Sequence, residues 1–350
     1  MSILPNVPPK QICILRLSAI GDICHVLPVI RTLQHVWPDT KLTWVIGKLE
    51  YQLVSDIPGI EFIIFDKRMG LKAYLSLKQS MRHRQFDLLL HMQMSLRASL
   101  ASLLIPARIK LGFDKTHAND LQWLFTNQRI AYKPEQHVVD SFFGFIEAFG
   151  IHQRVMQWGI PINQQISQSI VTLVPDTPYI IISPCSSMPY RNWSVTGYAA
   201  AADYIAKHYA LPVVLTGGTT EIEKQYGKNI TALCKHKPVN LIGQTNLKQL
   251  LAIIKNARGV IAPDSGPAHM ATAVATPVIG LYACTNPDRA RPYNSSAYII
   301  NKYPQAVKAK FGKNVDEIPW GTRVRDIGTM DRISIDDVCK QINYLLEENL

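Results

Sequence analysis

Residues 258–283 read RGVIAPDSGPAHMATAVATPVIGLYA, and this stretch decides the fold. Residues 259–262 and 278–282 are apolar runs typical of buried strands, 263–267 contain the Pro and Gly of a turn, and 268–275 are Ala-rich like a tightly packed helix. In open α/β sheets, ligands bind at the carboxyl ends of strands and a helix N-terminus faces phosphate groups. Asp264, Ser265 and Gly266 would then lie at a nucleotide site. The alternative is that Asp264 or Ser265 only caps the helix.

Apolar runs alternate with helical stretches along most of the chain. We expect strands at residues 11–17, 41–46, 61–65, 86–92 and 110–113, and then at 179–183, 212–216, 239–242, 259–262, 278–282 and 298–300. This alternation predicts an α/β fold whose parallel sheets carry helices on both faces. The polar, Pro-containing segment 153–178 separates the two sets of strands, and we expect 301–334 to be irregular. We therefore predict domains at 1–165 and 166–333, and a last helix at 334–350 that could pack back on the first domain.

The chain of 350 residues has a formal net charge of +11, and both halves are basic. Such a charge suits an anionic partner: a nucleotide, a phosphorylated glycolipid, a membrane surface or nucleic acid. The six cysteines are scattered without a C-x-x-C pair, which argues against zinc and against a disulfide framework and fits a reducing cytoplasm. The basic stretch 72–84 is most simply a solvated helix face, although it could also contact anionic lipid.

A carboxylate stands where the first expected strand turns into a helix, in Arg16-Leu17-Ser18-Ala19-Ile20-Gly21-Asp22. The stretch lacks the G-x-G-x-x-G pattern, which disfavours a dinucleotide site. Asp22 could accept a proton from an attacking hydroxyl, since a helix N-terminus would keep it ionised. The alternative is an ordinary Asp at a helix start.

Polar residues also follow two strands of the second set. Residues 183–193 include Ser186, Ser187 and Arg191, which could hold a pyrophosphate, or could form an ordinary loop before a helix capped by Ser194. Residues 216–221 form a Gly turn that could approach a ligand closely or could simply start a helix. The candidates in that turn are Thr216, Gly217, Gly218 and Glu221, the last as a ribose ligand.

A fourth polar turn follows the strand at 86–92. Gln93 and Arg97 could reach an anionic acceptor, while an exposed Arg at a helix start is the simpler explanation. The four turns have one property in common, since each lies at the carboxyl end of a predicted strand.

The chain resembles glycosyltransferase family 9, the bacterial lipopolysaccharide heptosyltransferases, over nearly its full length. The resemblance rests on ILRLSAIGDICHVLP at 14–28, similar to the family's S-x-x-G-D-x-x-x-x-L-P, and on DSGPAH at 264–269, similar to D-[ST]-G-x-x-H. LYACTNPDRARPY at 281–293 and WGTRVRD at 320–326 look most like the heptosyltransferase I branch.

The resemblance implies a GT-B fold, in which two Rossmann-like domains with parallel sheets face a central cleft. It implies an inverting, metal-independent transfer of L-glycero-D-manno-heptose from ADP-heptose to Kdo of lipid A, with no cofactor. The enzyme would work in the cytoplasm as a peripheral protein at the inner face of the inner membrane, with an anionic membrane surface and no nucleic acid as partner.

The resemblance also implies roles for individual residues. Asp22 is the general base, and Ser18, Gly21, Gln93 and Arg97 are acceptor-side positions. The donor-side positions are Ser186, Ser187, Arg191, Thr216, Gly217, Gly218, Glu221, Asp264, Ser265, Gly266 and His269. Glu223 stands close enough to Glu221 to leave the ribose ligand open between the two. The rival hypotheses are another glycosyltransferase or a nucleotide-sugar epimerase on the same fold, and a non-catalytic protein that binds anionic ligands.

Overall fold

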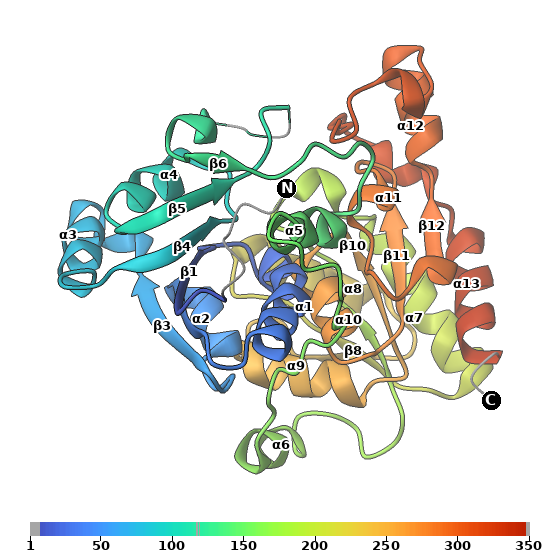
Figure 1. Cartoon of the computed structure of the whole chain (residues 1–350). Coiled ribbons are helices and arrows are strands. Elements are labelled where there is room, and N and C mark those ends of the chain that lie inside the picture. The colour runs from blue at the N-terminus through green and yellow to red at the C-terminus, as the bar shows by residue number, and fades with distance from the viewer. Residues whose placement is uncertain (1–7, 117, 119, 348–350) are drawn as a thin grey trace. The chain divides into compact units, whose positions relative to one another are not determined.

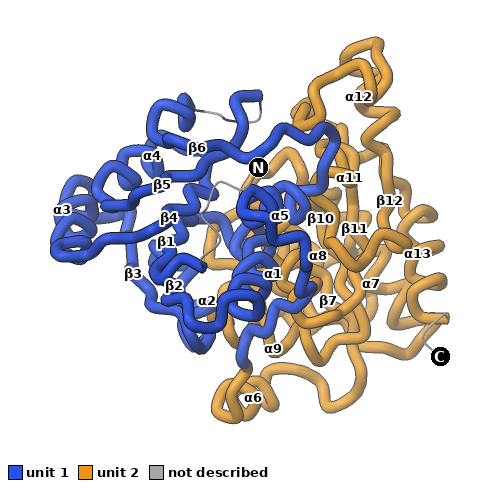
Figure 2. The backbone as a smooth tube through the Cα atoms, viewed as in Figure 1, with its two compact units in different colours: residues 1–161 blue, residues 162–350 orange. Residues whose placement is uncertain are grey.

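The chain forms two compact units, Met1–Pro161 and Ile162–Leu350 (Figure 2). The computed structural model describes residues 8–116, 118 and 120–347. The division falls close to the domain boundary that we predicted at 165–166.

The first unit is built on a parallel sheet with the strand order β3-β2-β1-β4-β5-β6 (Figure 1). Its core lies between this sheet and its helices and includes Leu15, Phe65, Phe86 and Leu89. The strands are β1 Gln11–Leu15, β2 Lys41–Gly47, β3 Ile60–Phe65, β4 Phe86–His91, β5 Ala107–Gly112 and β6 Gln128–Arg129. The helices are α1 Ile20–Val36, α2 Lys48–Val54, α3 Leu71–Ser80, α4 Leu96–Leu103 and α5 Val138–Glu147, with short 3₁₀ turns at Lys67–Met69 and Gln122–Leu124.

The second unit repeats this arrangement, with the strand order β12-β11-β10-β7-β8-β9 and every pair parallel. Its core includes Ile182, Trp193, Ile261 and Leu281. The strands are β7 Ile180–Ile182, β8 Val213–Leu215, β9 Val239–Asn240, β10 Gly259–Pro263, β11 Val278–Tyr282 and β12 Ile299–Asn301. The helices are α6 Gln164–Ile170, α7 Val195–Tyr209, α8 Glu221–Leu233, α9 Leu247–Asn256, α10 Gly266–Ala273, α11 Pro287–Ala290, α12 Tyr303–Phe311 and α13 Ile335–Glu347, with a 3₁₀ turn at Pro189–Arg191.

Each sheet has the strand order of a Rossmann fold, since counting the strands of either unit in chain order gives 3-2-1-4-5-6. The order reverses between β1 and β4 in the first sheet and between β7 and β10 in the second. Ligands of such sheets bind beyond the carboxyl ends of the strands at this reversal. The fold therefore points to two places on the chain, the turns after β1 and β4 and the turns after β7 and β10.

The segment 301–334, which we predicted to be irregular, contains the helix α12. Pro304 lies in the first turn of α12, and Gly312, with φ 69°, follows its last residue. A proline near the start and a glycine just past the end are typical of helices. Tyr303 and Val307 pack on Val324 in a small cluster of their own. The prediction was wrong because we took the length of the segment as a sign of irregular structure and did not use Pro304 and Gly312 as helix-end signals.

The C-terminal helix α13 packs against α7, β11 and β12. Its buried stripe of Val338, Ile342, Leu345 and Leu346 joins the core of the second unit. The expectation that this helix could pack back on the first domain stays a prediction. At its start the hydroxyl of Ser334 accepts the Asp337 N–H at 3.1 Å, which satisfies one of the free N–H groups of the first turn.

The helix after Pro263 differs slightly from its predicted range of 268–275. It begins at Gly266 and ends at Ala273, because Ala275 takes a left-handed conformation with φ 60°. The earlier start matters for the site, since it places Ser265 and Gly266 at the helix N-terminus. No helix among residues 8–116, 118 and 120–347 is long and apolar enough to cross a membrane.

Candidate functional site

The turn between β1 and α1 is organised around the buried side chain of Arg16. Its guanidinium donates to the Met92 carbonyl at 2.5 Å and forms an ion pair with the Asp22 carboxylate. The Asp22 carboxylate also accepts the Ala19 N–H at 3.4 Å, and its second oxygen lies 3.9 Å from His25 Nδ1. The turn includes a cis peptide bond between Ser18 and Ala19. Arg16 therefore ties the end of β1 to the end of β4 and orients Asp22.

The Asp22 side chain is 35% exposed, so a ligand can reach it. Burial favours its protonated form, but the Arg16 guanidinium and His25 outweigh burial and hold the pKa of this carboxyl well below its usual range. Asp22 is therefore ionised at neutral pH and can accept a proton or a hydrogen bond from a hydroxyl.

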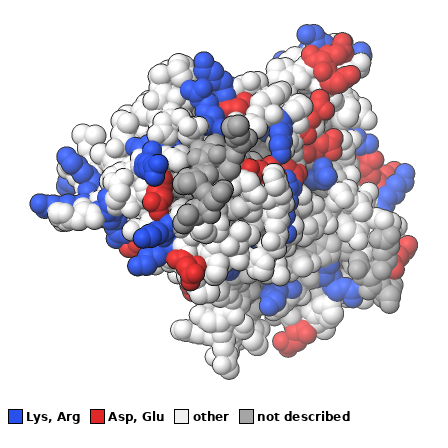
Figure 3. Space-filling model, viewed as in Figure 1, with Lys and Arg blue, Asp and Glu red and all other residues white. Residues whose placement is uncertain are grey.

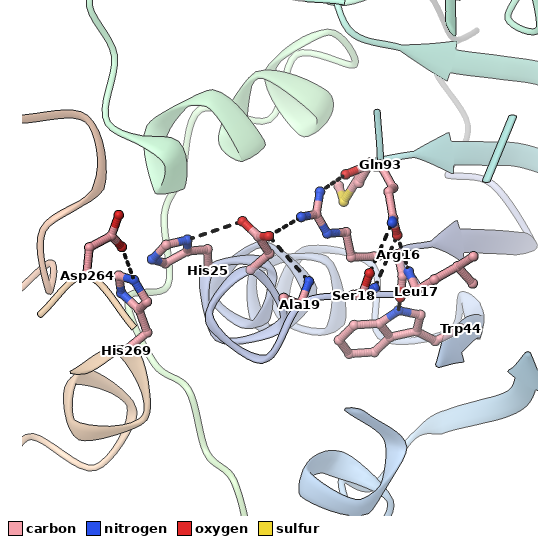
Figure 4. A network of polar contacts seen from close by, with 11 residues as sticks. Arg16, Leu17, Ser18, Ala19, His25, Trp44, Gln93, Asp264 and His269 are labelled. Atoms are coloured by element: carbon pink, nitrogen blue, oxygen red, sulfur yellow. Dashed lines mark hydrogen bonds and ion pairs between the residues drawn. The ribbon is translucent and has the colours of Figure 1, made fainter. Parts of the chain in front are cut away.

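Gln93, at the end of β4, fastens the same turn (Figure 4). Its Oε1 accepts the N–H groups of Leu17 at 2.6 Å and Ser18 at 3.1 Å, and its Nε2 donates to Ser18 Oγ at 3.2 Å. We predicted Gln93 and Ser18 on the acceptor side of the site. The structure brings them together, but it uses their polar atoms on each other and on the backbone of the turn.

Two buried side chains that we did not predict from the sequence, His91 and Gln122, hold the segment that carries Gln93. The Gln122 amide donates to the carbonyls of His91 at 2.7 Å and Gln93 at 3.2 Å, and it lies 3.0 Å from His91 Nδ1. Gln122 Oε1 accepts the Phe113 N–H at 3.1 Å. Burial lowers the pKa of His91 to about 3, so its imidazole is neutral. Nothing in the local sequence links residues 31 positions apart, so only the fold reveals this support.

The remaining residues predicted on the acceptor side lie nearby in the chain. Gly21 is in the first turn of α1 beside Asp22, and Arg97 is in the first turn of α4 with an exposed side chain. The Arg97 carbonyl accepts the hydroxyl of Tyr74 at 3.3 Å. The guanidinium of Arg97 is accessible to an anionic ligand.

At the reversal point of the second sheet, Asp264 and Arg191 join the turn after β10 to the turn after β7. Arg191 Nη1 lies 3.0 Å from the Asp264 carboxylate and donates to the Asp264 carbonyl at 3.2 Å. His269, in α10, places its Nε2 3.6 Å from the other carboxylate oxygen (Figure 4). Arg191 and Asp264 are 73 residues apart in the sequence. The structure thus brings Arg191 next to Asp264 and His269 of the second motif, and we predicted all three as donor ligands.

The Asp264 carboxyl is well shielded from solvent but ionised. Burial favours its protonated form, and His269, Arg191 and Thr285 together lower its pKa below the usual value. Ser265 caps α10 without using its hydroxyl, which is buried and has no hydrogen-bond partner among the described residues. The N-terminus of α10, with Gly266 as its first residue, and the adjacent Arg191 together make a surface that suits an anion.

The turn after β7 carries the predicted diphosphate ligands. Ser186 Oγ accepts the Met188 N–H at 3.0 Å, and the Ser186 N–H donates to Asn192 Oδ1 at 2.8 Å. Ser187 is exposed. Ser186 is therefore partly used in shaping the turn, while the hydroxyl of Ser187 is accessible to a ligand.

The Gly turn before α8 distinguishes two neighbouring glutamates. Glu223 accepts the Gly218 N–H at 2.7 Å and the Thr220 hydroxyl at 2.6 Å, and its N–H donates to Thr220 Oγ1 in return. Glu221 is exposed, and no hydrogen bond to its side chain is found within the described part of the chain. Glu221 is thus the carboxylate available to a ligand, while Glu223 holds the turn.

Thr216, which we predicted as a donor ligand, follows the last residue of β8. Its side chain is completely buried, and its hydroxyl has no hydrogen-bond partner among the described residues. Gly217 is partly exposed and Gly218 is exposed, so the backbone of the two glycines is accessible at this turn.

A small, partly open pocket is lined by Asp264. Its other lining residues include Thr285, Asn286, Arg289 and Trp320. Asn286 is 4% exposed, and its Nδ2 has no hydrogen-bond partner among the described residues. The sequence analysis used these segments only as family marks and did not name their side chains as ligands. No group of three or more His, Cys, Asp or Glu in residues 8–116, 118 and 120–347 is placed to hold a metal ion.

Comparison with known proteins places this geometry in a family. The sequence model of glycosyltransferase family 9 (heptosyltransferase) matches residues 74–319. The lipopolysaccharide core heptosyltransferase OpsX of Haemophilus influenzae is 41% identical over 338 residues, which cover 96% of this chain and 97% of that protein.

Two solved structures share the fold. A family 9 glycosyltransferase from Veillonella parvula superposes with a TM-score of 0.78 at 22% identity and covers 97% of both chains. The E. coli heptosyltransferase WaaC with ADP superposes with a TM-score of 0.70 at 18% identity, covering 96% of this chain and 99% of that one. A second structure of WaaC contains ADP-2-deoxy-2-fluoro heptose. The resemblance seen in the two sequence motifs is confirmed: the chain belongs to glycosyltransferase family 9, the heptosyltransferases, and it has the GT-B fold of two Rossmann-like units.

Proposed function

We propose that this protein transfers L-glycero-D-manno-heptose from ADP-heptose to Kdo of lipid A during synthesis of the lipopolysaccharide inner core. The proposal rests on the residues that lie at the two points where the strand order reverses. The first unit offers an ionised, accessible carboxylate at Asp22, and the second offers Arg191 and a helix N-terminus to an anion. The name of the 41% identical relative, a lipopolysaccharide core heptosyltransferase, supports the same reaction.

The donor binds to the second unit. Arg191, Ser187 and the N-terminal N–H groups of α10 suit the diphosphate, because charge-assisted bonds from Arg and helix ends favour phosphate oxygens. The bound ADP of the E. coli relative supports ADP as the nucleotide. Glu221 is the ribose ligand in this proposal, since both oxygens of Glu223 are occupied within the Gly turn. Asp264 and the adjacent pocket accept hydroxyl groups of the sugar.

The transfer is a single displacement with inversion at the anomeric carbon. Asp22 accepts the proton of the attacking Kdo hydroxyl, whose oxygen forms the new bond as the bond from the sugar to ADP breaks. The departing diphosphate carries the bonding electron pair, and Arg191 with the helix N–H groups stabilises this charge without a metal ion. Because Arg16 lowers the pKa of Asp22, the base is ready at neutral pH but is a weak one, so its value lies in orientation as much as in basicity.

The acceptor is a lipid in this proposal, and the protein acts as a peripheral enzyme at the cytoplasmic face of the inner membrane. The net charge of +11 supports contact with an anionic membrane surface.

The test is ADP release from ADP-heptose, with and without Kdo-lipid A, by wild type and Asp22→Asn. We expect release only when the acceptor is present, and a fall in kcat of at least about a hundredfold in the variant. ADP affinity should stay unchanged, because the donor binds to the other unit. Asp39→Asn, an exposed carboxylate just after α1, is the matched control and should behave as wild type.

Two results would contradict the proposal. Normal turnover by Asp22→Asn would remove Asp22 as the base, and ADP release that ignores the acceptor would exclude glycosyl transfer to Kdo. Thermal unfolding of the variant, which loses the ion pair with Arg16, separates a catalytic defect from a folding one.

A further inference from the structure

The segment around α3 is strongly basic and carries exposed leucines. Residues 67–84 contain Lys or Arg at six positions and neither Asp nor Glu. In the same segment Leu71 is 82% exposed, Leu75 is 66% exposed and Met69 is 47% exposed. Figure 3 shows basic side chains gathered over α3 at the left of the view. Nothing in the proposed reaction uses these residues.

The leucines lie on the outer side of α3 for a geometric reason. Ala73 and Leu77 are buried in the core of the first unit, so they define the inner side of the helix. Leu71 and Leu75 are four residues apart and share one side of an α-helix, which is turned away from that core. Lys78 is a further three residues along and lies on the same outer side, with Lys72 at its margin. We call Leu71, Lys72, Leu75 and Lys78 the α3 face.

The charge of the α3 face is not cancelled by its surroundings. The two carboxylates on the adjoining strand and turn are already paired, Glu61 with Arg84 at 2.6 Å and Asp66 with Lys48 at 3.0 Å. The exposed cations Lys72 and Lys78 have no ion pair within the described residues. The region therefore offers uncompensated positive charge next to apolar side chains.

The neighbouring helix α4 has the same character. Tyr74 of α3 bonds to the backbone of α4 at Arg97, so the two helices adjoin. Along α4, Leu96, Leu100 and Leu103 are 56%, 42% and 59% exposed and recur with helical spacing on one side. Exposed leucines on two adjoining helices are more than the isolated apolar residues that surfaces normally carry.

We propose that the α3 face docks on the surface of a bilayer that contains anionic lipid. Leucines that project from a helix can enter the boundary between headgroups and acyl chains, while flanking lysines remain among anionic headgroups. A second copy of this chain fits less well, because an isologous contact would bring two sets of uncompensated cations together. The inference rests on the proposed function only in that a lipid acceptor gives the enzyme a reason to be at a membrane.

The experiment is co-sedimentation of the full-length protein with vesicles that contain no acceptor. One set of vesicles is phosphatidylcholine alone and the other also contains phosphatidylglycerol. We expect wild type to bind the anionic vesicles much more tightly, and binding to weaken as salt is added. Lys72→Gln with Lys78→Gln should weaken binding about twenty-five-fold, since each cation near an anionic surface contributes about fivefold. Leu71→Ser with Leu75→Ser should weaken it about tenfold.

The matched control is Leu233→Ser with Lys228→Gln, which removes one exposed leucine and one exposed lysine from α8 of the second unit. It should bind vesicles as wild type does. ADP affinity, measured by calorimetry, should be equal in all of these proteins, so a loss of vesicle binding is distinguishable from failure of the proposed reaction. Absence of binding to anionic vesicles by wild type, or wild-type binding by both α3 variants, would overturn the inference. So would a dimer in sedimentation that the leucine variant abolishes without any change in vesicle binding.

Discussion

The buried imidazole of His91 makes the stability of the first unit sensitive to mild acid. His91 is completely buried, and burial lowers its pKa to about 3, whereas the pKa of a histidine in an unfolded chain is about 6.5. The folded state therefore keeps His91 neutral while the unfolded state binds a proton below pH 6.5. Stability from this residue is complete above about pH 6.5 and is lost as the pH falls from there towards 3.

The size of this loss follows from the unfolded state alone, because the folded pKa lies far below the pH of the test. Between about pH 7.5 and about pH 5.5, proton binding by one unfolded histidine lowers the free energy of unfolding by about 1.4 kcal/mol. His91→Gln removes the titrating group and leaves a side chain that can accept a hydrogen bond from Gln122, whose amide lies 3.0 Å from His91 Nδ1. The variant is expected to be less stable at neutral pH but to lose about 1.4 kcal/mol less on acidification.

Urea unfolding of wild type and His91→Gln, followed by tryptophan fluorescence at both pH values, measures this difference directly. Carboxylates that titrate in the same range affect both proteins equally, so they cancel in the comparison. The same acid-induced loss in the two proteins would show that His91 is not held neutral, and would refute the reasoning.

Two further predictions concern the second unit. A methyl group at Gly197, in the first turn of α7, would lie 2.5 Å from the fully buried ring of Trp193, so Gly197→Ala should destabilise by about 1–3 kcal/mol despite a gain in helix propensity. Gly144→Ala in α5 is the control, since its methyl group would lie 3.3 Å from the flexible end of Ile130 and no closer than 3.8 Å to the Cβ of that residue; it should be neutral or stabilising in thermal unfolding. Glu221→Ala should weaken ADP binding in calorimetry without changing stability. Glu223→Ala, by contrast, should destabilise the start of α8 by about 1 kcal/mol, because it removes the capping box. An unchanged ADP affinity in Glu221→Ala would remove it from the ribose site.

The sequence predicted the fold well where local signals agree. Apolar runs such as 278–282 match β11 to the residue, because a strand buried on both faces of a parallel sheet is apolar throughout. The short edge strand β6, at Gln128–Arg129, was missed because it consists of two exposed polar residues and leaves no apolar run in the sequence.

The candidate site was predictable as a set of turns but not as a set of contacts. The position of Asp22 followed from the order of strand and helix, yet the bond from Arg16 to the Met92 carbonyl and the contacts of Gln93 with the same turn depend on β1 and β4 lying side by side. The burial of Thr216 was likewise invisible, since its neighbours in sequence do not show which side of the turn faces the core. Partners separated by tens of residues are chosen by the fold.

The Gly turn before α8 differs from the rest of the candidate site because most of its hydrogen bonds join residues that are close in sequence. Most of its side-chain hydrogen bonds join Gly218, Thr220 and Glu223, three residues within six positions of one another, and the Gly243 N–H adds a bond to the Gly217 carbonyl at 3.1 Å. A turn held mostly by such local bonds could be transplanted into another parallel sheet as a short segment. The ion pair of Arg191 with Asp264 cannot be transplanted in this way, because it forms only where β7 and β10 are neighbours. In the proposed donor site, engineering can therefore exchange the Gly turn as a unit, while the pair of Arg191 and Asp264 must be changed residue by residue in place.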